Sequence, residues 1–145
     1  MQALNCFLRN VEELKREKGI QSELFSKEVG INSRTMRRWR EGRMPKADSL
    51  EKVAKYFNCS IEFLLGRTEV IDFYPSKNPS DFLTRYNLLK AEKNLKDIDI
   101  SKKCKISTGT ISKWKKGRIP DTEALISLCK IFDCSFDYLI GRSES

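Results

Sequence analysis

Histidine is absent from the 145 residues, which removes the commonest general base and the commonest metal ligand. Neither closely paired cysteines nor a phosphate-binding loop is present, so zinc and nucleotide sites are not expected. A cysteine nucleophile would also lack its histidine partner. The five cysteines include no Cys-x-x-Cys pair, and an odd number argues against a disulfide framework. We therefore predict a protein that is not an enzyme and needs no cofactor or metal.

Long apolar runs are also missing, and none approaches the roughly 18 residues that would span a membrane. The opening residues, Met1–Asn5, lack the basic segment and apolar stretch of a secretory signal. We therefore expect a cytoplasmic protein. Lysine and arginine number 28 against 20 acidic residues, giving a net charge of +8, and the 39% hydrophobic content is enough to build cores.

An internal repeat organises the chain. A shift of 75 residues lays Phe7–Arg67 on Phe82–Arg142 without a gap. Identical residues recur along the whole overlap, including Trp39 and Trp114, Gly42-Arg43 and Gly117-Arg118, Pro45 and Pro120, Cys59-Ser60 and Cys134-Ser135, and Gly66-Arg67 and Gly141-Arg142. The chain is therefore two copies of one unit of about 60 residues, near the lower size limit for a domain that folds alone.

The repeat predicts one domain over residues 1–67, a linker over residues 68–81 and a second domain over residues 82–145. Pro75 and Pro79, with neighbouring serines, mark the linker. Its first half, Val70–Tyr74, is too apolar for a plain flexible tether. We expect that part to pack on a domain or across a dimer interface.

Hydrophobic residues recur at helical spacing in both units, and no segment shows sustained strand alternation. The sequence thus predicts an all-α protein of two tandem five-helix domains. Gly19 and Asn94 are expected to end the first helix of each unit, and Asn32 and Ser107 to cap the third.

The third helix carries one tryptophan in each unit. Trp39 lies at helical spacing from Met36, and Trp114 from Ile111, which indicates core packing. Two exposed stacking platforms are the alternative interpretation.

The second and third helices of each unit are short and joined by a tight turn, the arrangement of a helix-turn-helix. Residues 31–46 hold six basic side chains against one acid, and residues 102–118 hold seven with no acid. The basic excess therefore gathers on the third helix and its flanks, as phosphate contact requires. An ordinary solvated surface is the alternative.

These segments resemble a known family. Gly30–Pro45 and Lys105–Pro120 are similar to the signature of phage-repressor and Cro-like helix-turn-helix regulators, the xenobiotic-response-element type. Phe57–Gly66 and Phe132–Gly141 fit the end of such domains as well. The resemblance implies two lambda-repressor-like domains, duplex DNA as the partner, and transcription regulation, with repression favoured.

The resemblance also implies which residues meet DNA. Bases would be read by the residues that open the third helix: Ser33, Arg34, Arg37, Arg38, Thr108, Ser112 and Lys113. Phosphates would be held by residues around it: Ser22, Arg40, Arg43, Lys115, Lys116 and Arg118. Arginine suits base reading because its planar fork can bridge O6 and N7 of guanine.

The second unit departs from the family at two positions. The family usually has glutamine at the start of the second helix. Unit one has Ser22 there, which can still donate to a phosphate, whereas unit two has Asp97, whose carboxylate would repel phosphate. Gly109 offers no side chain for reading bases. We therefore expect unit one to read the sequence and unit two to assist. An alternative function is a protein-interaction module, as in an antitoxin, in which one or both units serve dimerisation or partner binding. A homodimer stays open in either case.

Overall fold

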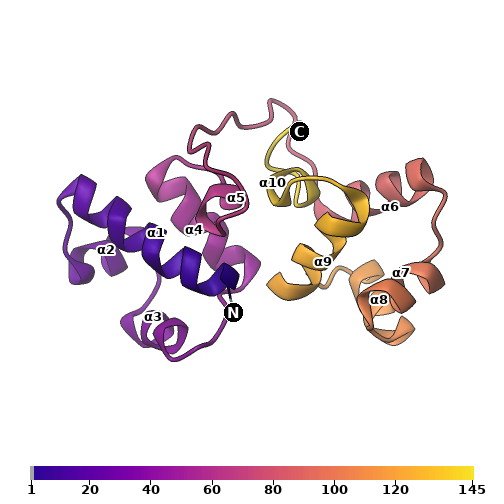
Figure 1. Ribbon diagram of the computed structural model, residues 1–145, viewed down its shortest axis with the longest axis horizontal. Coiled ribbons are helices and arrows are strands. Elements are labelled where there is room, and N and C mark those ends of the chain that lie inside the picture. The colour runs from indigo at the N-terminus through magenta and orange to yellow at the C-terminus, as the bar shows by residue number, and fades with distance from the viewer. Residues whose placement is uncertain (1) are drawn as a thin grey trace. The chain divides into compact units, whose positions relative to one another are not determined.

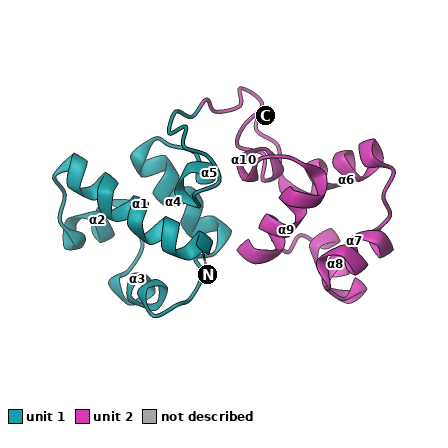
Figure 2. Ribbon diagram, in the orientation of Figure 1, with its two compact units in different colours: residues 1–73 teal, residues 74–145 magenta. Residues whose placement is uncertain are grey.

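The computed structural model describes residues 2–145, and its regular elements over that range are helices alone, which confirms the all-α prediction (Figure 1). Residues up to Phe73 form unit 1, and Tyr74–Ser145 form unit 2 (Figure 2). The helices of unit 1 are α1 (Gln2–Lys18), α2 (Ser22–Val29), α3 (Ser33–Arg40), α4 (Ala47–Phe57) and α5 (Ile61–Leu64). Those of unit 2 are α6 (Phe82–Lys93), α7 (Asp97–Cys104), α8 (Thr108–Lys115), α9 (Thr122–Phe132) and α10 (Phe136–Leu139).

Each unit buries its own core. In unit 1, α1 contacts α3 and α5, while α4 contacts α2 and α5. Trp39 is 4% exposed, and its ring meets Phe7 edge-on with centroids 5.2 Å apart. In unit 2, Trp114 is 3% exposed and meets Phe82 and Tyr86 in the same edge-on manner. The prediction that both tryptophans belong to the core is confirmed.

The helix-turn-helix of each unit has the same turn. After α2, Gly30 adopts a left-handed conformation, φ 77°, and the Ser26 hydroxyl donates a hydrogen bond to the carbonyl of Ile31. The Asn32 side chain then caps α3 by accepting from the Thr35 amide at 2.8 Å. This places the start of α3 directly after a rigid corner.

Unit 2 repeats that turn with one difference. The Ser101 hydroxyl donates to the carbonyl of Ile106 at 2.5 Å, and Ser107 caps α8. Lys105 occupies the left-handed position at φ 57°, where unit 1 has glycine. A side chain there is disfavoured, because its Cβ lies close to the following carbonyl oxygen. Both predicted caps of the third helix, Asn32 and Ser107, are confirmed.

A buried polar residue ties the last helix of each unit to its first. Asn10 donates to the carbonyls of Phe63 and Leu64 at 2.9 and 3.2 Å. Its equivalent in unit 2, Arg85, donates to the carbonyls of Tyr138 and Ser143 at 2.9 and 3.0 Å. These bonds attach the first helix of each unit to the backbone at and after its last helix.

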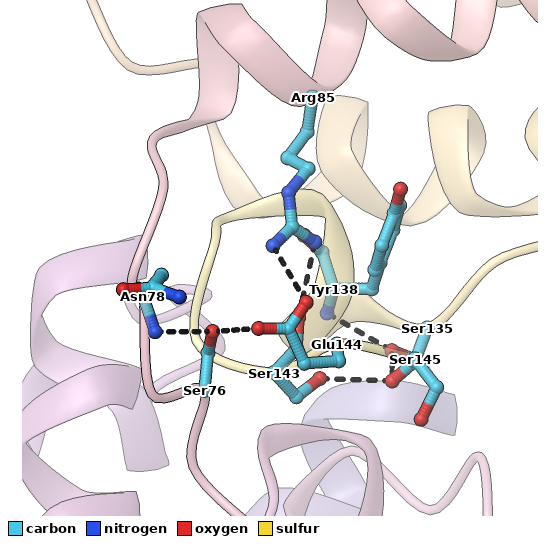
Figure 3. A network of polar contacts seen from close by, with 8 residues as sticks. All are labelled: Ser76, Asn78, Arg85, Ser135, Tyr138, Ser143, Glu144 and Ser145. Atoms are coloured by element: carbon cyan, nitrogen blue, oxygen red, sulfur yellow. Dashed lines mark hydrogen bonds and ion pairs between the residues drawn. The ribbon is translucent and has the colours of Figure 1, made fainter.

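The end of the chain folds back on unit 2 (Figure 3). Glu144 lies 3.9 Å from Arg85 and accepts a hydrogen bond from the buried Ser76 hydroxyl. The Ser76 amide donates to the Arg142 carbonyl at 2.8 Å, and the Ser80 amide donates to the Gly141 carbonyl at 3.2 Å. The stretch from Ser76 onward is therefore bonded to unit 2.

Three apolar residues ahead of Ser76, Val70, Ile71 and Tyr74, are exposed, whereas Phe73 is half-buried. Val70 is 61% exposed and Tyr74 is 80% exposed. The expectation that this stretch packs on a domain is wrong for these two residues. Packing across a dimer interface stays a prediction.

We predict that Trp39→Ala lowers the free energy of unfolding of unit 1 by about 3–5 kcal/mol, because it removes ring contacts and leaves a cavity. A domain of this size has about that much stability in total. Thermal unfolding followed by circular dichroism measures the loss. A variant that melts like the parent would contradict the inward placement.

Candidate nucleic-acid interface

The helix α3 presents one apolar face and one basic face. Met36 and Trp39 are 7% and 4% exposed and point into unit 1. The predicted base-reading residues all lie on the exposed side: Ser33, Arg34, Arg37 and Arg38. Arg34 and Arg38 are one helical turn apart and therefore neighbours on the same face. The structure thus brings the predicted readers of unit 1 together on one surface.

The equivalent face of α8 has fewer charged side chains than that of α3. Thr108, Ser112 and Lys113 are exposed, as is Gly109. The Ser112 hydroxyl donates to the Thr108 carbonyl at 3.1 Å, so its proton is used within the helix. Lys113 is the one charged group among the four.

The basic flanks follow the end of each third helix. Gly42 and Gly117 take positive φ values of 110° and 104°, which turn the chain sharply. The Arg43 amide then donates to the Arg38 carbonyl at 2.9 Å, and the Arg118 amide donates to the Lys113 carbonyl at 3.1 Å. The predicted phosphate contacts at the ends of these helices and in the flanks, Arg40, Arg43, Lys115, Lys116 and Arg118, are all exposed.

A buried lysine connects the first helix of unit 1 to its helix-turn-helix. The Lys15 side chain is 9% exposed, and its ammonium donates to the Ser22 hydroxyl at 2.9 Å and to Glu12 at 3.0 Å. Ser22 is exposed at the first position of α2, and no side chain caps the backbone amides of that helix start. An exposed helix start of this kind favours an anion.

Unit 2 has the same lysine but a different partner. Lys90 donates to Asp97 at 2.5 Å, the Tyr86 hydroxyl donates to the same carboxylate at 2.9 Å, and Lys115 forms an ion pair with it. Partial burial opposes ionisation, but the hydrogen bonds from Lys115, Lys90 and Tyr86 outweigh it and lower the pKa of Asp97 to about 2. The start of α7 is further occupied by Asp99, which accepts from the Lys96 amide at 2.9 Å.

This arrangement bears on two expectations. Asp97 is not a lone repelling carboxylate, because two lysines neutralise it. Lys115, expected on a phosphate, forms an ion pair with Asp97, and its phosphate contact stays a prediction. The sequence carried a signal for this pairing that was missed: Lys15 and Lys90 are equivalent in the repeat, yet Asn87 replaces Glu12, so Lys90 needs a carboxylate from elsewhere.

Comparison with known families covers both units. Residues 10–69 match the Cro/C1-type helix-turn-helix DNA-binding domain, and residues 86–139 match a helix-turn-helix family. The chain carries two helix-turn-helix domains of the Cro/C1 type. The resemblance predicted from residues 30–45 and 105–120 is confirmed. No curated protein and no solved structure matches the chain.

Membership of this family gives the general function of the protein. Cro/C1-type domains bind duplex DNA, and this tandem helix-turn-helix protein is a DNA-binding transcription regulator. Over residues 2–145, no helix combines the length and apolarity that a membrane crossing needs. Within the same range, no cluster of three or more acidic, cysteine or histidine side chains is placed to hold a metal ion.

Proposed function

We propose that this tandem helix-turn-helix protein is a sequence-specific repressor in which α3 reads bases in the major groove and unit 2 assists. One observation carries the proposal: α3 buries Met36 and Trp39 and exposes Arg34, Arg37 and Arg38 on its opposite side. Arginines on an exposed, short, rigidly capped helix suit bidentate contacts to guanine.

The phosphate contacts proposed for unit 1 surround that face. Arg40 and Arg43 lie at the end of α3, and Ser22 lies at the uncapped start of α2. Phosphate at a helix start is stabilised by free backbone amides and the helix dipole. Unit 2 lacks this feature, because Asp97 and Asp99 occupy the start of α7. This contrast supports the assignment of sequence reading to unit 1 and of assistance to unit 2, through Lys113, Lys116 and Arg118.

The first prediction concerns how the affinity for duplex DNA depends on salt concentration. With Lys115 paired with Asp97, four charged phosphate contacts are proposed, Arg40, Arg43, Lys116 and Arg118, which give a log–log slope of affinity against salt of about −3.6. Titration of the full chain against a random duplex at several salt concentrations measures the slope. A slope near zero would contradict DNA binding and favour the protein-interaction alternative.

The second prediction concerns base recognition by α3. Arg34→Ala and Arg38→Ala should each cost about 1–3 kcal/mol on the preferred site and relax base preference there. Arg43→Ala is the matched control in the same unit, since a phosphate contact should weaken binding equally on every sequence. Selection of duplexes by the purified protein supplies the preferred site. Equal, sequence-blind losses for all three variants would show that Arg34 and Arg38 only hold phosphate.

The tether between the units limits the spacing of their half-sites. Arg67 donates its amide within unit 1 and Ser76 is bonded to unit 2, which leaves the eight residues 68–75 between them. Fully extended, they reach about 26–29 Å. Together with the width of the two units, this reach is enough for half-sites one DNA turn apart, about 34 Å.

We therefore predict that one chain binds a non-palindromic pair of half-sites one turn apart. Inserting five base pairs should weaken binding, because it places the half-sites on opposite faces of the duplex. Inserting ten restores the face, so it should weaken binding less than inserting five. Band-shift titration of the three duplexes tests this, and equal affinity for all three would contradict it.

A further inference from the structure

We propose that Asp97 holds Lys115 in place of a DNA phosphate, and so sets how weakly unit 2 binds DNA. The proposal rests on the proposed function, since it concerns the same interface. It identifies Asp97 as an affinity-determining residue that acts through Lys115 and need not touch DNA.

The side chains around Asp97 form an anion site, and the Asp97 carboxylate itself occupies it. One carboxylate oxygen accepts from Lys90 and Tyr86 at 2.5 and 2.9 Å, and the other pairs with Lys115. The Asp97 side chain is 25% exposed, whereas the Lys115 side chain is 50% exposed. Lys115 therefore lies at the protein surface, but its ammonium is directed to an internal carboxylate.

Unit 1 shows the same framework without the internal anion. Lys15 takes its counter-charge from Glu12, three residues earlier on α1, and meets a neutral hydroxyl at Ser22. Arg40, the equivalent of Lys115, is exposed, and its side chain has no hydrogen bond or ion pair with another residue in the described range 2–145. Its charge is therefore available to a phosphate.

The cause of the difference is one neutral residue on α6. Lys90 has a side chain only 14% exposed, and a buried ammonium requires a paired carboxylate. Asn87 stands three residues before it, where unit 1 has Glu12, and cannot supply one. The carboxylate comes from Asp97 instead, and it also captures Lys115. To contact phosphate, Lys115 must first leave Asp97, so the contact adds little affinity and releases little counterion.

The test exchanges the two arrangements without changing the net charge. The variant Asn87→Glu/Asp97→Ser moves the acid to α6 and gives unit 2 the residues of unit 1, with the net charge still +8. Lys115 then gains a phosphate contact. The log–log salt slope should steepen from about −3.6, for four charged contacts, to about −4.5 for five. Across a fourfold rise in salt, the variant should lose affinity about 3.5-fold more than the parent.

Lys115→Ala is the control in both backgrounds. In the exchanged variant it should return the slope to the parent value, whereas in the parent chain it should leave the slope nearly unchanged. The reverse exchange in unit 1, Glu12→Asn/Ser22→Asp, should make the slope shallower by about 0.9, because Arg40 becomes held. Thermal unfolding checks that each variant is folded.

The outcomes separate this inference from the proposed function. If the parent chain shows no salt-dependent DNA binding, the proposed function fails. If the parent binds but the exchanged variant has the same slope, the inference is overturned. If the exchanged variant does not fold, Lys115→Ala in the parent chain tests the inference. A slope shallower by about 0.9 would show that Lys115 already contacts phosphate and would overturn the inference.

Discussion

The burial of one tryptophan per unit is the constraint on which the rest of each unit depends. The helices α3 and α8 have eight residues each, too few to be stable alone in water. Trp39 and Trp114 lie on the buried faces of these two helices and attach them to the core of each unit. Once those faces are fixed, the helical period decides which residues face outward. The basic surface of α3 is therefore a consequence of where its tryptophan packs.

A second constraint is the buried lysine that joins the first helix to the start of the second. Its ammonium must have a carboxylate partner in a poorly hydrated place. Glu12 meets that need in unit 1 without touching the helix-turn-helix, whereas Asp97 meets it in unit 2 from within the helix-turn-helix. The two units thus differ in which basic side chains are unpaired at the surface, although each has a basic third helix.

Much of this could be predicted from particular residues. The 75-residue repeat, the spacing of Met36 and Trp39, and the caps Asn32 and Ser107 required only local periodicity and turn chemistry, and the structure agrees with each. The bonds of Ser76 to Arg142 and Glu144 could not be predicted, because they join a linker to a chain end 66 and 68 residues away. They shorten the segment that connects the two units.

The sequence by itself determined the two-unit, all-helical organisation, the helix-turn-helix family and the exposed arginines of α3, because each depends on residues close together along the chain. Only the tertiary structure decided which charges remain available to a phosphate. Lys115 and Asp97 are 18 residues apart and lie on different helices, and their pairing arises from the way α7 and α8 pack around the turn at Lys105. Ionic partners depend on distance in space, and no local pattern in the chain encodes that distance.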